Sequence, residues 1–208
     1  MEATLKYKPT TKDELEELVS DLSINLGDID TSLITDMSGL FDFQRACRTD
    51  FSGIENWDVS NVTDMSYMFA GAKNFNQPLN NWDVSNVTDM RGMFLGATSF
   101  NQDISNWDVS NVIDMCFMFF RAENFNQPLN SWNVSNVTDM GNMFAEAFSF
   151  NQPLDKWDVS SVTNMSWMFK RAENFNQPLN NWDVSNVENM YDVFDGAENF
   201  NQYIKWLE

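Results

Sequence analysis

Aspartates that recur at a fixed interval are the first residues in this sequence whose type and spacing could support chemistry. Neighbouring members lie 25 residues apart, and asparagine takes one place in the series, at position 133. The members of this Asp column are Asp58, Asp83, Asp108, Asp158 and Asp183. Carboxylates are ligands for Ca²⁺, although calcium needs about six to eight oxygens around one point. Two interpretations stay open: weak calcium binding along the column, or a structural row of exposed side chains.

Other catalytic chemistry is poorly represented in the sequence. The chain has no histidine, and it shows no phosphate-binding loop and no nucleophile beside a base. Carboxylate pairs of the glycosidase type can be drawn, but no apolar pocket that would raise the pKa of one partner is identifiable. The sequence therefore predicts a protein that is not an enzyme, with no catalytic residues and no cofactor. Cys47 and Cys116 fall at unrelated places in the pattern, which favours reduced thiols over a disulfide.

Large apolar residues at variable positions form a second candidate site. Core packing does not require apolar side chains there, and we expect them on the convex, helical side of the molecule. The residues predicted to bind a partner are Tyr67, Leu95, Phe117, Phe120 and Trp167. Exposed apolar groups of this kind mark contact surfaces for proteins. The alternative is that each ring packs across a small residue of the next unit, such as Gly92 or Asn142.

A repeated unit of 25 residues must position these side chains. Tryptophan opens six consecutive units and predicts a structural ladder made of Trp57, Trp82, Trp107, Trp132, Trp157 and Trp182. In the second unit, apolar residues from Val87 to Ala97 are spaced as on one face of a helix, whereas Trp82 and Val84 alternate with polar neighbours as in a strand. The sequence predicts an α/β repeat solenoid with one short parallel strand and one short helix per unit.

Two further columns of polar residues accompany the apolar ones. Asparagine followed by glutamine recurs in every unit and could form a ladder of side-chain amides: Asn76, Asn101, Asn126, Asn151, Asn176 and Asn201. A second acidic column occupies the first turn of the predicted helices, where carboxylates favour the helix dipole: Asp64, Asp89, Asp114 and Asp139, followed by Asn164 and Asn189. Both columns are expected to be structural.

The unit as a whole, which reads WDVSNVTDMSYMFAGAKNFNQPLNN at residues 57–81, resembles the repeat of BspA-like bacterial surface proteins. Residues 79–84 also match the strand signature of leucine-rich repeats, although Val87 stands where those repeats have their ladder asparagine. The resemblance to this family, which includes mycoplasma and Listeria lipoproteins, implies a right-handed leucine-rich-repeat-like coil. It also implies a protein of the cell surface that binds other proteins or adheres to surfaces.

The regions around the repeats suggest how the chain is organised. Residues 1–28 hold an N-terminal segment with a capping helix expected over 11–22, and residues 29–56 form a degenerate first repeat with an inserted loop near 42–50. Residues 57–206 hold the six 25-residue repeats, and residues 207–208 form the C-terminal end. An uncovered last coil would favour end-to-end or lateral self-association.

The net charge narrows the range of partners. The chain carries 12 basic and 31 acidic side chains, a formal charge of −19, so we expect no binding to nucleic acid. No apolar stretch is long enough for membrane insertion, and no signal peptide or lipid-attachment cysteine is recognisable, so the chain as written reads as cytoplasmic. The favoured function is a non-enzymatic scaffold for an unknown protein ligand. The alternative is a structural or adhesive cell-surface module with calcium on the Asp column.

Overall fold

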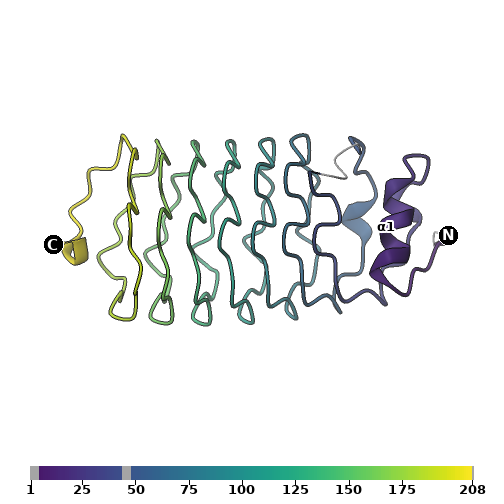
Figure 1. Cartoon of the computed structure of the whole chain (residues 1–208), viewed down its shortest axis with the longest axis horizontal. Coiled ribbons are helices and arrows are strands. Elements are labelled where there is room, and N and C mark those ends of the chain that lie inside the picture. Colours follow the sequence, from purple (N-terminus) through teal and green to yellow (C-terminus); the bar gives the residue numbers. More distant parts are fainter. Residues whose placement is uncertain (1–4, 44–47, 208) are drawn as a thin grey trace.

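The computed structural model describes residues 5–43 and 48–207, which form a rod of stacked coils (Figure 1). Each 25-residue unit makes one coil, and helix α1 (Lys12–Ser20) lies at the N-terminal end of the rod. The other helices among the described residues are short 3-10 helices: η1 (Leu26–Asp28), η2 (Ile54–Asn56) and η3 (Lys205–Leu207). No helix in the described part of the chain is long and apolar enough to cross a membrane. The predicted stacking of repeats and the single N-terminal helix are therefore confirmed.

The strand and the helix predicted within each unit are both wrong. Across residues 57–206, all of which the structure describes, there is no α-helix, and neighbouring coils share a single-residue parallel bridge. In the second unit that bridge involves Asp89, which pairs with Asp64 and Asp114, and not the residues beside Trp82. The leucine-rich-repeat-like pattern of one strand and one helix per unit is thus replaced by coils with little regular secondary structure.

Alternating backbone hydrogen bonds explain why no helix forms. Every second N–H donates to the next coil, as from Met90 to Asp114 O at 3.0 Å and from Phe94 to Met118 O at 2.9 Å. The N–H groups between them close tight turns within the coil, as from Leu95 to Gly92 O at 3.0 Å. A helix would need every N–H for bonds to the residue four before it. The apolar spacing of three and four residues therefore arises from consecutive turns.

The turns require left-handed residues at two positions of a unit. In the second unit these are Gly92 with φ 58° and Gly96 with φ 66°, and in the third they are Phe117 with φ 59° and Arg121 with φ 57°. A residue with a side chain loses about 1–2 kcal/mol in this conformation, so it occurs as single residues and interrupts a right-handed helix. The helical spacing of the apolar side chains therefore could not by itself produce a helix.

Stacked aromatic rings form the core of the rod. Phe94 lies 3.9 Å from Phe100 of its own coil and 5.7 Å from its equivalent Phe119 in the next coil, measured between ring centroids. The six ladder tryptophans are at most 4% exposed, and the rings of Trp107 and Trp132 stack with an interplanar angle of 3°. Among the described residues, every buried side-chain nitrogen and oxygen has a hydrogen-bond partner. Repetition therefore places equal rings in register along the rod.

The predicted asparagine ladder is confirmed. Asn101 Oδ1 accepts a hydrogen bond from Asn126 N of the next coil at 2.9 Å and another from Gln127 Nε2 at 3.0 Å. The same pair of bonds recurs one coil later, where Asn126 Oδ1 accepts from Asn151 N at 3.0 Å. The glutamine that follows each asparagine is therefore explained, since it supplies the second donor of each step.

Helix α1 closes the N-terminal end of the core. Leu15 and Val19 on its inner face belong to the same buried cluster as the residues of the coils. Arg48 is 7% exposed, and its guanidinium donates to Val19 O at 3.1 Å and to Asp21 O at 2.8 Å. These bonds satisfy carbonyls that the helix leaves without partners at its C-terminal end. Cys47 and the centre of the predicted inserted loop fall at 44–47, outside the described residues.

Candidate interaction surface

One side of the rod carries the turns with left-handed residues, and we call it the turn face. It consists of residues 63–71 of the first unit and their equivalents in the other five units. All five residues predicted to contact a partner lie there: Tyr67, Leu95, Phe117, Phe120 and Trp167. Tyr67 is 37% exposed, and the other four side chains are half-buried. Each of these side chains therefore presents part of its apolar surface to solvent.

Aromatic residues occupy the first left-handed position in alternate coils. Tyr67, Phe117 and Trp167 have φ values of 56°, 59° and 55°. The intervening coils have Gly92 and Asn142 at the same position. Glycine and asparagine are the residues that this conformation accepts most readily, whereas bulky side chains are rare in it. The chain therefore places aromatic rings at every second coil against the preference of the backbone.

One of these rings is packed within the chain. An added Cβ at Gly92 would lie 2.5 Å from Cδ1 of Tyr67, so the tyrosine ring lies directly across that glycine of the next coil. Burial raises the pKa of the Tyr67 hydroxyl, in keeping with a ring held against the surface. One side of the Tyr67 ring therefore packs across Gly92, as the second interpretation predicted, and the other side stays accessible to solvent.

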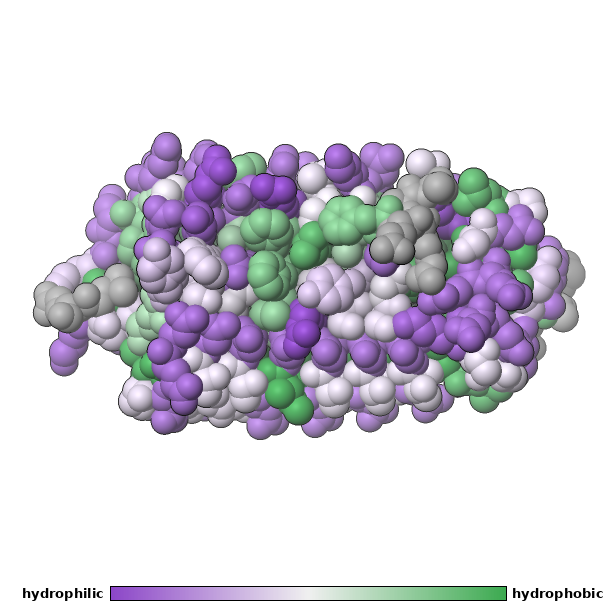
Figure 2. All heavy atoms as spheres, viewed as in Figure 1, coloured by the Kyte–Doolittle hydropathy of each residue, from purple (hydrophilic) through white to green (hydrophobic). Residues whose placement is uncertain are grey.

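An apolar patch occupies the centre of the turn face (Figure 2). The rings of Phe117 and Phe120 meet edge to face with their centroids 5.8 Å apart. Half-buried Leu95 occupies the position equivalent to Phe120 one coil earlier. The guanidinium of Arg121 lies 5.2 Å from the centroid of the Phe120 ring, close enough for a cation–π contact. The patch is therefore a set of mutually supported rings with a cation at its edge.

Phe43 belongs to the same surface and was not among the predicted residues. It is 60% exposed, and an added Cβ at Gly71 would lie 2.0 Å from its Cδ1. The sequence does contain a signal for it, because the similarity between residues 29–41 and 57–69, continued for two residues, aligns Phe43 with Gly71. Assigning this segment to an inserted loop concealed that position.

A second aromatic pair lies nearer the C-terminal end of the turn face. The rings of Trp167 and Tyr191 meet edge to face, with centroids 5.4 Å apart. Lys170 Nζ lies 6.0 Å from the centroid of the Trp167 ring and 3.2 Å from Asp195 Oδ2. Tyr191 is exposed and was not predicted as a site residue. The turn face thus has two aromatic clusters, each accompanied by a cation.

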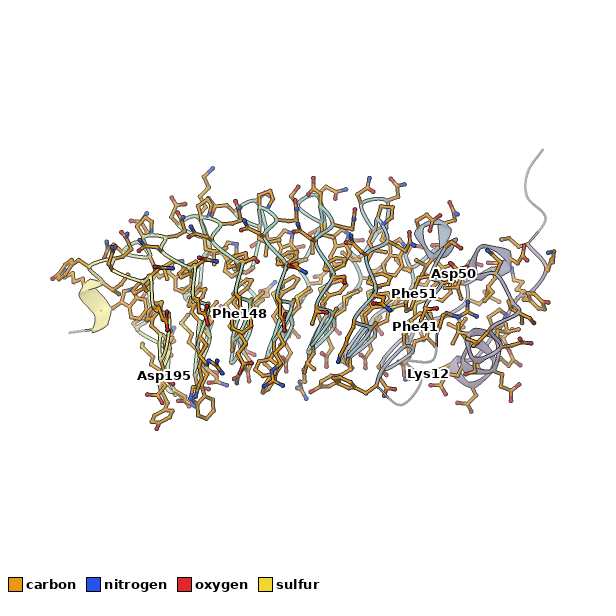
Figure 3. The ribbon with its side chains drawn as sticks, turned by 90° about the horizontal axis from the view of Figure 1, so that it is seen from above. Lys12, Phe41, Asp50, Phe51, Phe148 and Asp195 are labelled. Carbon is orange, nitrogen blue, oxygen red and sulfur yellow. The ribbon has the colours of Figure 1, made fainter. Side chains whose placement is uncertain are left out.

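The rod bows so that the turn face is its inner side (Figure 3, in which Asp195 marks the turn face). Backbones that share parallel bridges lie about 4.8 Å apart, and these bridges run along the turn face. Equivalent rings of neighbouring coils lie farther apart as their distance from the turn face increases. Their centroids are 5.7 Å apart for Phe94 and Phe119, and 6.5 Å apart for Trp107 and Trp132. The coils therefore fan out from the turn face, and the aromatic residues expected on a convex side lie on the concave one.

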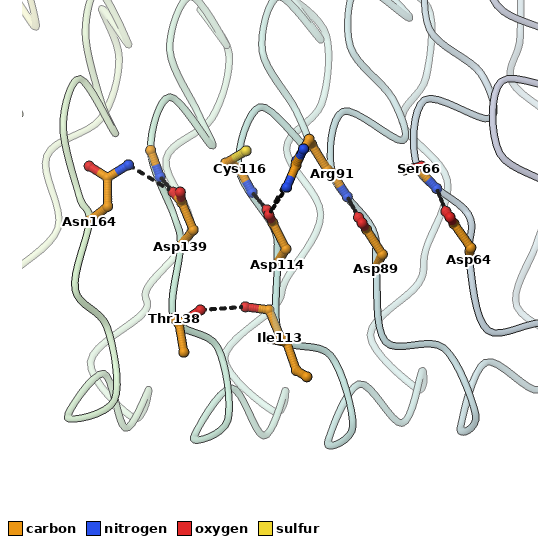
Figure 4. A network of polar contacts seen from close by, with 11 residues as sticks. Asp64, Ser66, Asp89, Arg91, Ile113, Asp114, Cys116, Thr138, Asp139 and Asn164 are labelled. Carbon is orange, nitrogen blue, oxygen red and sulfur yellow. Dashed lines mark hydrogen bonds and ion pairs between the residues drawn. The ribbon is translucent and has the colours of Figure 1, made fainter.

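Charged side chains on the turn face have an uneven exposure. Arg91 is 43% exposed and donates from Nε to Asp114 Oδ2 at 3.2 Å, while the side chain of Asp114 is only 17% exposed (Figure 4). Arg121 is 56% exposed and donates to Glu146, which is 17% exposed, at 2.8 Å. In each pair the carboxylate is recessed and the guanidinium extends outward. The charge that a partner meets around Arg91 and Arg121 is therefore cationic, whereas at the C-terminal end of the face the side chain of Asp195 is 52% exposed and that of its partner Lys170 36%.

The second acidic column does not cap helices, because no helix follows it. Its carboxylates accept the backbone N–H two residues later, as Asp89 Oδ1 does from Arg91 N and Asp114 Oδ1 from Cys116 N, both at 2.9 Å (Figure 4). Burial raises the pKa of Asp89, and repulsion from Asp64 and Asp114 adds to the shift. The column therefore shapes the turns at the bridge between coils.

Among the described residues, one group of three could offer converging metal ligands: Asp114, Cys116 and Asp139. Burial, followed by the charge of Asp114, strongly raises the pKa of the Cys116 thiol, which keeps it protonated near neutral pH. Metal binding needs the thiolate. The Arg91 guanidinium also occupies Asp114 Oδ2. The three ligand atoms are therefore close enough to hold a metal ion, but the protonated thiol and the ion pair of Asp114 favour a structural role for the group.

The Asp column lies away from the turn face and is exposed. Each member accepts hydrogen bonds from the serine two residues later, as Asp108 Oδ1 does from Ser110 N at 3.1 Å and Asp83 Oδ1 from Ser85 Oγ at 2.6 Å. These bonds, with the side-chain hydroxyl first, lower the pKa of both carboxyl groups. Asn133 accepts from Ser135 in the same way. The carboxylates are thus engaged in local turns, and calcium binding along the column stays a prediction.

The stacked coils and the concave aromatic surface define a repeat solenoid with a candidate surface for binding. The chain belongs to the family described as Mycoplasma protein of unknown function, DUF285, whose model matches residues 13–131 and 102–206. The two matches overlap at residues 102–131, within the repeats. No curated protein and no solved structure matches the chain.

Proposed function

We propose that this protein is a non-enzymatic scaffold that binds a protein partner on the concave turn face. The observation that carries the proposal is the placement of Tyr67, Phe117 and Trp167 at left-handed positions, where glycine or asparagine would fit the backbone better. Residues kept against a local preference are expected where function or packing requires them. Packing accounts for part of the Tyr67 ring only, since that side chain is 37% exposed.

The rest of the surface supports the same role. Phe43 is largely exposed, and Leu95, Phe117 and Phe120 are partly so, which gives a contiguous apolar patch with cations at its edge. Aromatic and arginine side chains dominate the binding energy of protein interfaces. Solenoids present such residues on an extended concave side that neighbouring repeats hold rigid. The resemblance to BspA-like surface proteins agrees with this role, and the surface location that it implies stays a prediction.

The test compares the natural chain with the variant Tyr67→Asn, Phe117→Asn and Trp167→Asn, which places asparagine or glycine at the first left-handed position of the first five units. Proteins retained by the immobilised natural chain are identified, and the affinity of each for both forms is measured by calorimetry. We expect a true partner to bind the variant at least about tenfold more weakly, a difference of about 1.4 kcal/mol.

A matched control changes the Asp column at Asp58→Asn, Asp108→Asn and Asp158→Asn, copying Asn133 of the same column. This control should bind every partner as the natural chain does. If the aromatic variant retained full affinity for all partners, or if the control lost affinity to the same extent, the turn face would not be the binding surface.

A further inference from the structure

We propose that the turn face takes an extended peptide in the polyproline II conformation that carries acidic side chains and lies along the rod. This inference rests on the proposed function, because it names the chemistry of the partner for the same surface. Three features of the structure point to this occupant: the spacing of the aromatic rings, the accessible faces of those rings, and the charge at their edges.

The spacing of the aromatic platforms matches one conformation of a bound peptide best. Tyr67, Phe117 and Trp167 lie in alternate coils, so at about 4.8 Å per coil they recur about every 9.6 Å along the turn face. A polyproline II helix rises about 3.1 Å per residue and returns to the same side every third residue, after about 9.3 Å. An extended strand returns after about 6.6 Å, and an α-helix returns to the same side after about 10.5 Å.

The rings themselves suit proline. The Tyr67 ring lies across Gly92, so one face rests on the backbone and the opposite side is open. Phe117 and Trp167 are each supported at an angle by a neighbouring ring, at 79° and 87°. Aromatic-lined surfaces bind proline-rich segments because the peptide is already ordered and loses little entropy. A proline at every third residue would meet one platform after another.

Charge complementarity decides which residues stand between the prolines. Arg91 precedes Gly92 in the sequence, and Lys170 Nζ lies 6.0 Å from the centroid of the Trp167 ring. The side chains of Arg91, Arg121 and Arg171 are 43%, 56% and 52% exposed, whereas their partners Asp114 and Glu146 are each 17% exposed. A carboxylate on the peptide would therefore approach a guanidinium before it approached an acid. A basic peptide would meet the same cations in these coils and be repelled there, although Asp195 at the C-terminal end of the face is 52% exposed.

The experiment measures fluorescence anisotropy of a labelled peptide of about nine residues built from Pro-Pro-Glu, long enough to pass from the first aromatic platform to the third. Two controls have the same length: Pro-Pro-Lys repeats reverse the charge, and Gly-Ser-Glu repeats keep the charge without the conformation. We expect the Pro-Pro-Glu peptide to bind at least about tenfold more tightly than either control.

Variants of the protein locate the binding. Phe117→Asn and Trp167→Asn should each weaken the Pro-Pro-Glu peptide about tenfold or more. Asp108→Asn, which lies in the Asp column away from the turn face and copies Asn133 of that column, should leave binding unchanged. Circular dichroism shows whether each variant keeps the fold of the natural chain.

Three outcomes would overturn the inference. Equal binding of the Pro-Pro-Glu and Gly-Ser-Glu peptides would show that the polyproline II conformation does not matter for binding. Tighter binding of a glutamate-rich helical peptide would show that the turn face binds a helix instead. A dimer that dissociates on Phe117→Asn, seen by sedimentation velocity, would assign it to a second copy of the chain. If no proline peptide binds while a captured partner still depends on the three aromatic residues, this inference fails and the proposed function stands.

Discussion

The tryptophan side of the rod and the turn face differ in how strictly their side chains repeat from coil to coil. On the tryptophan side each coil repeats the same residue and the same bond, as from Trp107 Nε1 to Leu79 O and from Trp132 Nε1 to Ile104 O, both at 3.0 Å. On the turn face the backbone bonds recur, but the side chains change from Phe117 to Asn142 in consecutive coils. Because main-chain bonds hold the turn face, its side chains are free to differ. The constant columns therefore stabilise the fold, and the variable ones are available for recognition.

The largest effect is expected on the tryptophan side. Trp132→Ala removes a buried ring from the middle of its column together with its hydrogen bond to Ile104 O, and the free energy of unfolding should fall by about 3–5 kcal/mol. Urea denaturation followed by circular dichroism measures the change. Trp132→Phe keeps a ring and should lose less. An alanine variant as stable as the natural chain would mean that the column does not support the stack.

The asparagine ladder should show an intermediate effect that depends on position. Asn126→Ala leaves Asn151 N of the next coil without its acceptor and removes one of the two acceptors of Gln152 Nε2, which keeps Asn126 O at 3.1 Å, so unfolding should cost about 1–3 kcal/mol less. Asn201 is the matched control, because within the described part of the chain its Oδ1 accepts only a long 3.4 Å bond from the adjacent Gln202. Equal losses from Asn126→Ala and Asn201→Ala would show that bonds between coils do not determine the effect.

The turn face should tolerate substitution, with a cost set by the backbone alone. Asn142→Phe places an aromatic ring at a left-handed position that now holds asparagine, and stability should fall by no more than about 1–2 kcal/mol. The ring would also interrupt the alternation of large and small residues, so the Pro-Pro-Glu peptide should bind more weakly. A clear gain in stability would mean that aromatic residues are placed there for packing.

The smallest effect concerns the Asp column and appears at acid pH. Hydrogen bonds lower the pKa of Asp83, Asp108, Asp158 and Asp183 below the value in the unfolded chain. Their contribution is therefore complete above about pH 4 and is lost as the pH falls through the lowered values. The fourfold Asp→Asn variant should thus lose less stability than the natural chain between about pH 4 and pH 2.

The same variant separates the two interpretations of the Asp column. If the column is structural, millimolar calcium leaves the melting temperature of both forms unchanged. A rise with calcium in the natural chain alone would assign a cation site to these aspartates and favour the structural or adhesive alternative for the protein.

The stacking of the coils could be predicted from the sequence, whereas the path of the backbone within each coil could not. The 25-residue recurrence of Trp57 to Trp182 and of the Asn-Gln pairs was sufficient to predict coils in register, because identical buried residues can only stack on their equivalents. The helix was wrong because turns closed between residues three apart give the same apolar spacing as a helix. Positive φ values distinguish the two, and their sign in the sequence is the glycine or asparagine that stands in the same columns of other coils, such as Gly92 and Gly96, and not the type of Phe117 or Arg121.

The candidate surface was predicted in part for a related reason. Differences between units identified Phe117 and Trp167, since a column that varies is not constrained by the core. Phe43 was missed because its segment was assigned to an inserted loop, although continuing the similarity of residues 29–41 with 57–69 aligns it with Gly71. The concave placement followed from the bridges on the turn face, which draw the coils together there, and these depend on a backbone geometry that the sequence does not display.

The most direct test of the account compares two phenylalanines that are two residues apart in the third unit. Phe119 is fully buried in the ring stack, and Phe117 is half-buried on the turn face. Urea denaturation of Phe119→Ala should show a loss of about 3–5 kcal/mol, whereas Phe117→Asn should stay within about 1 kcal/mol of the natural chain. Losses of similar size in the two variants would place Phe117 in the core and contradict a turn face that is free to bind.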